Sequence, residues 1–328
     1  MCILGTPTIS VVMATYNGEK YISQQLDSIL SQTVMPTEII IQDDCSSDST
    51  RKILHDYSSK HEIIKLFFNE KNLGFKNNFA SACMKANCDY IALADQDDIW
   101  LPNHLKVLIE SIKDKAMSCA DALLVDSDNN SMNLTFSETK KLYYVPVSDL
   151  EKSYRILYGS YGGFLQGASM LFKRSLYDIL FPIPQSQSFH DVWITIVTCF
   201  VGGFNYSTEI ITRYRQHGAN VTENKKFSFL REMFRRTHID YVPGRLDAVI
   251  ALKERIKGLD DKLTAPMAEV TDLLDQFINY SSDCKCFRNR FKCWKFRSLH
   301  YSEIYSTRSN RKKFFQSIQY LLTPSNNK

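Results

Sequence analysis

The sequence predicts an α/β fold built on a doubly wound, mostly parallel sheet, and three observations support this prediction. Over the first 130 residues, short apolar runs typical of buried strands alternate with segments whose apolar residues recur at helical spacing. Repeated β–α crossovers of this kind join parallel strands of one sheet. Unusual polar residues follow several of the apolar runs, and ligands of such sheets bind at the carboxyl ends of the strands.

The elements follow in order along the chain. The expected strands of the first part cover residues 9–14, 38–42, 63–68, 90–94 and 122–125, and the expected helices cover 19–32, 49–59, 77–86 and 101–113. Further on we expect a polar loop at 126–153, a glycine-rich loop at 159–167, strands at 168–173 and 204–215, and a helix at 192–200. The pattern beyond residue 224 is helical and charged, so we predict an α/β domain at 1–223 and a helical, basic region at 224–328.

Composition and charge narrow the class of protein. With 328 residues, of which 44% are hydrophobic and 23% charged, the chain has the composition of an ordinary globular protein. Nine scattered cysteines and a start without signal-peptide character favour a reducing, cytoplasmic location. Residues 1–223 carry a balance of −6 and residues 224–328 a balance of +10. This asymmetry predicts an acidic partner for the C-terminal region, either lipid headgroups or nucleic acid.

The most informative stretch is Asp95-Gln96-Asp97-Asp98, directly after the apolar run 90–94. Adjacent carboxylates repel one another and must be solvated or neutralised. A hard cation such as Mg²⁺ is the usual neutraliser, and it keeps coordination sites free for phosphate oxygens. The alternative is that Asp97 or Asp98 caps a helix that begins near residues 101–102. Capping explains one Asp and not three, so the cluster favours metal and phosphate chemistry.

Five ordered segments resemble the N-terminal half of glycosyltransferase family 2: residues 10–18, 26–33, 43–50, 72–75, and 95–98 with Pro102. The resemblance covers roughly residues 8–222, and residues 214–220 resemble the rhamnosyltransferase-like subgroup of cell-surface polysaccharide enzymes. It implies a GT-A fold, a nucleotide-diphosphate sugar donor, a divalent cation (Mn²⁺ or Mg²⁺) and inverting transfer. One departure is Cys45, which stands where the family usually has glycine.

The resemblance also implies roles for single residues. Thr15, Tyr16 and Asn17 would line the nucleotide pocket, and Asp44, or less expectedly Asp43, would accept a hydrogen bond from the pyrimidine ring. A turn and a helix cap are the structural alternative for this pair of acids. Asp97 would hold the metal, Asp95 would reach the ribose or the metal's water shell, and Asp98 would cap or contact the sugar. Lys76 would contact the diphosphate or the base, with a solvated surface lysine as the alternative.

The acceptor side of the site falls later in the chain. Asp191 matches the family's general base, although His190 stands where an acidic partner is usual. The alternative is that Asp191 only caps the helix that begins near Val192. His217 would be a ligand of the metal or diphosphate, or else a core histidine. The expected acceptor-side loop residues are Gly162, Gly163, Gln166 and Gly167.

Residues 284–297 interleave aromatic, cysteine and basic side chains. We interpret them as a peripheral membrane contact, with a solvated helical bundle, a zinc site and nucleic-acid binding as alternatives. The overall hypothesis is a cytoplasmic enzyme at the inner face of the membrane that glycosylates a saccharide or lipid-linked acceptor and binds no nucleic acid. A non-catalytic sugar-nucleotide-binding or scaffold protein and a nucleotidyltransferase are the competing functions.

Overall fold

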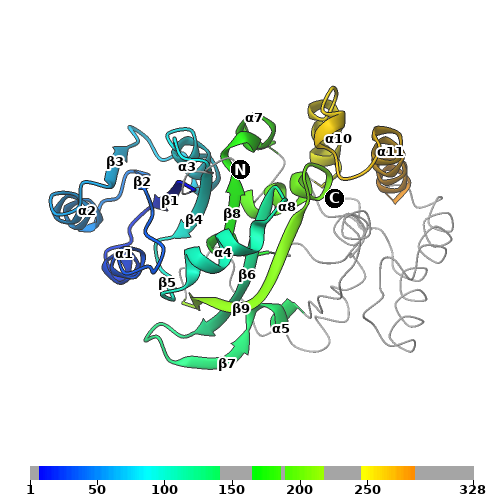
Figure 1. The fold of residues 1–328 in the computed structure, drawn as a ribbon. Coiled ribbons are helices and arrows are strands. Elements are labelled where there is room, and N and C mark those ends of the chain that lie inside the picture. The colour runs from blue at the N-terminus through cyan, green and yellow to red at the C-terminus, as the bar shows by residue number, and fades with distance from the viewer. Residues whose placement is uncertain (1–6, 141–164, 186–188, 218–244, 285–328) are drawn as a thin grey trace, which may run out of the picture.

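The computed structural model describes residues 7–140, 165–185, 189–217 and 245–284, and these form a nine-stranded mixed sheet with helices on both faces (Figure 1). The strand order is β3-β2-β1-β4-β8-β6-β9-β5, and β7 pairs with β6 outside this path. The strands are β1 Ile9–Thr15, β2 Glu38–Asp43, β3 Ile64–Phe68, β4 Tyr90–Asp95, β5 Ile99–Trp100, β6 Met117–Val125, β7 Ser131–Thr135, β8 Met170–Lys173 and β9 Phe204–Arg215.

The first half of the sheet is parallel, as the sequence predicts. Strands β3, β2, β1 and β4 run side by side in the same direction. The register pairs Thr15 of β1 with Asp43 of β2, and Ala14 of β1 with Asp95 of β4. The carboxyl ends of these three strands therefore meet at one edge of the sheet, where the polar motifs begin.

The second half is mixed, because β8 pairs antiparallel with both β4 and β6, while β9 runs parallel to β6. The two-residue strand β5 then pairs antiparallel with the end of β9, with Ile99 opposite Arg213. Since β5 follows the acidic cluster in sequence, this pairing brings the end of β9 against residues 95–98.

The helices are α1 Ile22–Leu30, α2 Thr50–Ser58, α3 Phe75–Cys83, α4 His104–Ile112, α5 Phe136–Lys140, α7 Tyr177–Leu180, α8 His190–Phe200, α10 Arg245–Arg255 and α11 Met267–Cys284. Helix α4 begins at His104 after Asn103, and β5 lies between it and the acidic cluster. The alternative that Asp97 or Asp98 caps this helix is therefore wrong. The expectation of a polar loop over residues 126–153 is wrong in its first part, since β7 and α5 lie there.

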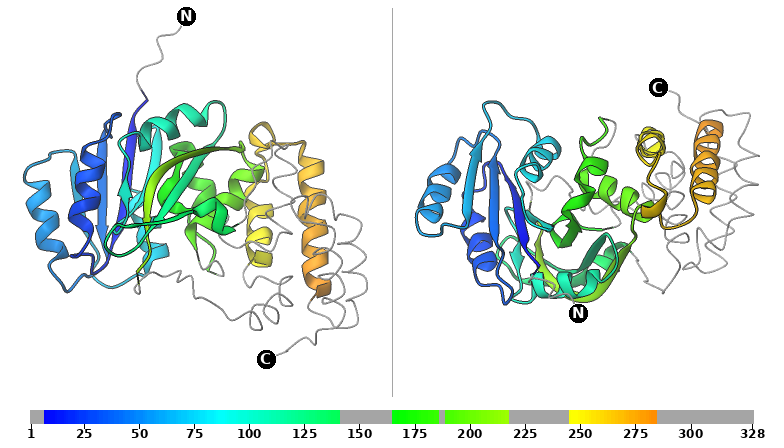
Figure 2. Two further views of the ribbon diagram at one scale, coloured as in Figure 1. Left: turned by 90° about the horizontal axis from the view of Figure 1, so that it is seen from below. Right: turned by 45° about the horizontal axis from the view of Figure 1, so that its top comes forward.

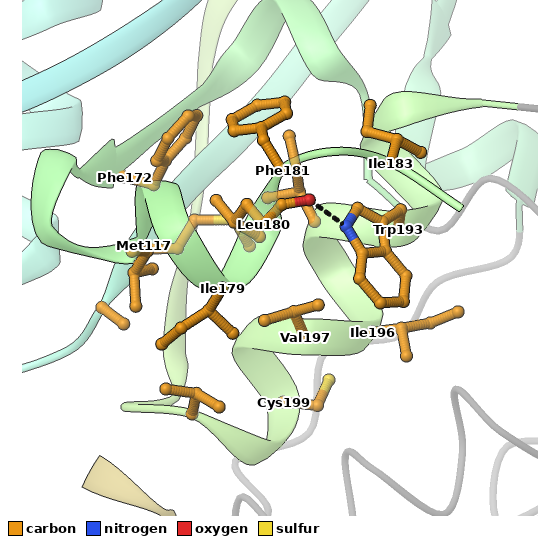
Figure 3. Close-up of a cluster of buried hydrophobic side chains, with 14 of the residues drawn as sticks. Met117, Phe172, Ile179, Leu180, Phe181, Ile183, Trp193, Ile196, Val197 and Cys199 are labelled. Atoms are coloured by element: carbon orange, nitrogen blue, oxygen red, sulfur yellow. Dashed lines mark hydrogen bonds between the residues drawn. The ribbon is translucent and has the colours of Figure 1, made fainter. Parts of the chain in front are cut away.

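Two hydrophobic clusters pack on opposite faces of the sheet. Along β1, Val12 points to the cluster formed with α3, α7 and α8, whereas Val11 and Met13 point to the cluster formed with α1, α2 and α4. Figure 3 shows the first cluster around Trp193 of α8, whose Nε1 donates to Leu180 O at 2.6 Å. Replacing such a buried tryptophan by alanine costs about 3–5 kcal/mol.

Helices α10 and α11 extend the cluster that surrounds Trp193. Their buried residues Val249, Leu252 and Leu274 belong to the same hydrophobic cluster as Val197 of α8. In both views of Figure 2 the two helices lie beside the α8 end of the molecule, far from α2. The described part of the C-terminal region is helical, as expected, and packs against the α/β body, while the domain boundary at residue 223 stays a prediction.

Candidate active site at the carboxyl edge of the sheet

The loops after β1 and β2 are joined to each other by hydrogen bonds. Asn17 N donates to Ser46 Oγ at 2.9 Å, and Asn17 Oδ1 accepts from Ser47 N at 2.9 Å. Gly18 N donates to Thr50 Oγ1 at 2.7 Å. Asn17 has a φ of +48°, a conformation that asparagine tolerates better than most residues. Tyr16 and Asn17 are exposed residues, and their contact with a nucleotide stays a prediction.

Asp43 is fully buried under these loops. Its carboxylate accepts hydrogen bonds from Thr15 Oγ1 at 3.1 Å, Ser46 N at 3.0 Å and Arg51 Nε at 2.6 Å. The turn chemistry offered as a structural alternative is therefore present at Asp43. Thr15 is also buried and directed at Asp43 rather than at solvent.

Asp44, only 2% exposed, organises the next loop. Its Oδ1 accepts from Asn69 Nδ2 at 2.8 Å and Leu73 N at 2.7 Å, and its Oδ2 accepts from Gly74 N at 2.8 Å. The carboxylate thereby fixes the segment that leads into α3. The contact of Asp44 or Asp43 with a pyrimidine ring stays a prediction, and in this structure both carboxylates hold protein donors.

The structure gathers Asp95, Asp97 and Asp191 at this edge. Burial first, and then the negative charges of Asp97 and Asp191, raise the pKa of Asp95 to about 8. Asp191 lies on α8, almost a hundred residues further along the chain. The expected metal-binding acids and the expected general base therefore share one electrostatic site.

Asp98 serves a different purpose from its neighbours. Its side chain is fully buried and accepts from Arg215 N at 3.0 Å, with Gln166 Nε2 3.5 Å from its other oxygen. Burial and then the charges of Asp97 and Asp95 raise the pKa of Asp98 well above its usual range. Asp98 thus anchors the end of β9 to the acidic cluster, and a sugar contact stays a prediction.

His217 lies beside Asp97, as the metal hypothesis requires. Nε2 of His217 is 2.8 Å from Asp97 Oδ2, and the two side chains keep 14% and 21% of their surface exposed. Within the described residues, no three His, Cys, Asp or Glu side chains form a ready metal cage. An imidazole and a carboxylate at an accessible edge still fit a Mn²⁺ or Mg²⁺ ion that takes its other ligands from water and phosphate.

Asp191 lies in the first turn of α8, which begins at His190 after Phe189. Its Oδ1 accepts from Val192 N at 2.7 Å, so the carboxylate binds one main-chain amide in the first turn of α8. The N-cap residue of this helix is Phe189, not Asp191. His190 packs on Phe79 with ring centroids 4.3 Å apart, and burial lowers its pKa to about 4. The imidazole beside Asp191 is therefore neutral near pH 7.

Lys76 lies in the first turn of α3, where its ammonium donates to Gln185 O at 3.2 Å and lies 3.5 Å from Pro184 O. This contact joins α3 to the segment that precedes α8. Of the expected acceptor-side residues, Gln166 and Gly167 lie near Asp98 and His190 respectively. Gly162, Gly163 and nearly all of residues 284–297 lie outside the described residues.

The contacts of two residues of this site were not predicted from the sequence. Arg215 is 1% exposed, and its guanidinium donates to Asp97 O at 2.8 Å, Ser127 O at 2.9 Å and Gln24 Oε1 at 2.8 Å. Gln96 pairs with the main chain of Tyr16. In the sequence, each residue stood out only because it lies inside a motif. Its contacts could not be predicted, because they join loops that are far apart in the chain.

The fold and this acidic edge define the GT-A class of glycosyltransferases. The crystal structure of the N-terminal region (residues 1–349) of TarS from S. aureus in complex with UDP has the same fold, with a TM-score of 0.56 at 16% identity, over 96% of this chain and 89% of that one. The chain belongs to glycosyl transferase family 2, whose model matches residues 10–180.

Three sequence relatives agree with this assignment. An uncharacterized glycosyltransferase of Nostoc is 27% identical over 65% of this chain and 66% of its own length. The putative teichuronic acid biosynthesis glycosyltransferase TuaG of Bacillus subtilis is 36% identical over 35% and 44%. The glucosyltransferase WfgD of Escherichia coli is 33% identical over 42% and 53%. The chain therefore spans two thirds of these relatives' length or less.

Among the helices of the described ranges, none is long and apolar enough to cross a bilayer. The expected peripheral contact depends on residues 284–297 and stays a prediction.

Proposed function

We propose that this chain is an inverting glycosyltransferase that takes a sugar from a uridine or thymidine diphosphate donor and transfers it to a saccharide or lipid-linked acceptor. The gathering of Asp95, Asp97 and Asp191 at one edge of the sheet carries this proposal. It brings together acids for a cation and diphosphate with an acid for the acceptor hydroxyl. Rhamnose is one candidate sugar, because residues 214–220 resemble the rhamnosyltransferase-like subgroup.

The relatives support a role in cell-surface polysaccharide synthesis. TuaG is named for teichuronic acid biosynthesis, and WfgD for glucose transfer from UDP-glucose to a diphosphoundecaprenol-linked sugar. A lipid-linked acceptor of that kind lies at a membrane. We therefore propose that this chain works at the inner face of the cell membrane on an O-antigen, capsule or exopolysaccharide precursor.

The donor would bind across the ends of β1, β2 and β4. The exposed Tyr16 and Asn17 offer an aromatic face and an amide for the nucleoside. Asp97 and His217 would hold the divalent cation, with Asp95 behind them. That cation would stabilise the charge that grows on the departing diphosphate.

The acceptor would approach from the α8 side. Inverting displacement needs a base opposite the leaving group, and Asp191 would remove the proton of the attacking hydroxyl. Its Oδ1 accepts from Val192 N, and this hydrogen bond restricts the orientation of the carboxylate. Because burial lowers the pKa of His190 to about 4, this side chain adds no positive charge beside Asp191 near pH 7.

The first test is the thermal stability of the full chain with nucleoside diphosphates and their sugars, with and without Mn²⁺. A ligand that binds only the native state stabilises it by mass action, by about 2.7 kcal/mol at a ligand concentration of a hundred times its Kd. The melting temperature rises as a result. We expect metal-dependent stabilisation by UDP or dTDP. No shift with any nucleotide would contradict the proposed donor site.

The second test separates catalysis from binding alone. Asp191→Asn keeps the shape of the side chain but removes the base, so we expect turnover to fall at least about a hundredfold with donor affinity unchanged. Asp178→Asn is the matched control, since Asp178 is an exposed acid in the first turn of α7. Donor binding without turnover in the wild-type chain would instead favour the scaffold function.

A further inference from the structure

Gln96 forms a paired hydrogen bond with the main chain of Tyr16. Its Oε1 accepts from Tyr16 N at 2.9 Å, and its Nε2 donates to Tyr16 O at 2.9 Å. A primary amide offers one acceptor and two donors on a single plane, so it can satisfy both groups of one residue at once.

This pair continues the sheet beyond its last main-chain bond. The ladder between β1 and β4 ends with Ala14 opposite Asp95, and Thr15 O is already used by Asp44 N at 2.9 Å. Tyr16 is the next residue of β1's chain, and Gln96 is the next residue of β4's. The side chain of Gln96 therefore takes the place of the neighbouring strand for one more residue.

Gly18 leaves the space that this amide occupies. A Cβ on Gly18 would lie 2.3 Å from Gln96 Oε1 and 2.7 Å from Gln96 Cδ, distances that real Cβ atoms do not show. Gly18 is absent from the glycines with positive φ, so its backbone accepts an L-residue. The need for glycine here is steric and comes from Gln96.

The tyrosine held in this way is the exposed aromatic residue of the site. Tyr16 keeps 51% of its surface exposed, whereas Thr15 just before it is buried. A fixed backbone limits the directions that the ring can take. A ring that is fixed before binding loses less conformational freedom when a ligand packs on it.

We propose that Gln96 is a positioning residue for the donor: it fixes Tyr16 so that the exposed ring presents a constant face to the nucleotide base, and Gly18 is required to make room for it. This inference rests on the proposed function. It adds that Gln96 and Gly18 set the donor affinity through Tyr16, without contacting the reacting atoms.

A double-mutant cycle tests the proposal on the full chain, with UDP and dTDP binding in Mn²⁺ measured by calorimetry and the melting temperature of each free variant recorded. We expect Gln96→Ala and Gly18→Ala each to weaken nucleotide binding about tenfold, the scale of one to two hydrogen bonds. Both changes release the same contact, so the double variant should bind no more weakly than either single one.

Steady-state kinetics provide the readout that a purely structural role would not produce. We expect Gln96→Ala to raise the donor KM about tenfold with kcat within about twofold of the wild type. In a Tyr16→Ala background, Gln96→Ala should cause no further loss, because the ring that it positions is gone.

Any one of four results would overturn the inference. Wild-type affinity in Gln96→Ala, or losses that multiply in the double variant, would show that the amide does not act through Tyr16. A lowered melting temperature with unchanged affinity would make Gln96 a structural residue only. A wild-type chain that binds no nucleotide would overturn the proposed function and this inference together. The other results would overturn this inference and leave the proposed function standing. Should Gly18→Ala fail to fold, Gln96→Ala and the Tyr16 background still decide.

Discussion

The guanidinium of Arg215 donates from Nε to the main-chain oxygen of Asp97 at 2.8 Å, while the Arg215 amide donates to the Asp98 carboxylate at 3.0 Å. The same guanidinium lies over the ring of Tyr21, 4.4 Å from its centroid. Since His217 follows two residues later and contacts Asp97, Arg215 fixes both members of the expected metal pair relative to each other. The end of β9 is thus part of the site.

Arg215→Lys should damage both stability and activity. A lysine ammonium lacks the planar fork that bonds three acceptors at once, so buried acceptors would lose their donors. We expect the free energy of unfolding in urea to fall by about 2–3 kcal/mol and kcat/KM to fall at least about tenfold. Arg213→Lys, two residues earlier on β9 and only partly buried, should stay within about 0.5 kcal/mol of the wild type. Equal effects of the two changes would contradict this role.

Most of the fold could be predicted because its elements carry strong periodic patterns. The strand expected at 204–215 matches β9, and the expected strand at 38–42 matches β2 within one residue. Strand β7 was missed, because its apolar residues Met132 and Leu134 are exposed and give no core pattern. Strand β5 has only two residues and exists through its pairing with β9, which no local pattern reports.

The site was predictable where one motif supplies several polar residues of unusual density. Asp95 and Asp97 stand out in sequence, and the structure places Asp191 beside them. The different contacts of the residues within the motif were not predictable: Asp98 is buried against Arg215, and Gln96 bonds the main chain of Tyr16. These contacts join loops that are far apart in sequence, so only the packed sheet defines them.

His190 should make the protein less stable in acid. Burial lowers its pKa to about 4, whereas an unfolded histidine titrates near 6.5, so between these values the unfolded state binds more protons. Stability should therefore fall as the pH drops from about 6.5 to 4, by up to about 3 kcal/mol from this residue. His190→Leu should remove that part of the slope in urea unfolding measured across this range.

His104 accounts for the pH dependence of stability that should remain in the His190→Leu variant. It is also buried, and burial lowers its pKa to about 3, so it adds a similar slope that His190→Leu leaves in place. The exposed His55, replaced by alanine, serves as the control for the loss of a histidine outside the core. An unchanged slope in His190→Leu would mean that folding does not lower the pKa of His190.

His217→Ala should weaken metal binding more than nucleotide binding. It removes one of the two side chains that we propose as direct ligands, and Asp97 alone would remain of the pair. We expect the Mn²⁺ concentration for half-maximal thermal stabilisation, measured at saturating UDP, to rise about tenfold or more. His55→Ala again serves as the control. An unchanged Mn²⁺ requirement would assign His217 to the core and not to the metal.

Lys76 has two candidate roles at the start of α3, a contact with the donor and a contact with the protein main chain. The sequence predicts a diphosphate or base contact, whereas in the structure its ammonium donates to Gln185 O, next to the segment that leads into α8 and Asp191. We expect Lys76→Ala to lower kcat several-fold, because the helix that carries the base loses a tether, and to leave the Kd for UDP within about twofold. Lys71→Ala, an exposed lysine in the preceding loop, is the matched control. Calorimetry decides the matter: a Kd raised tenfold or more with unchanged kcat would place the ammonium on the donor diphosphate.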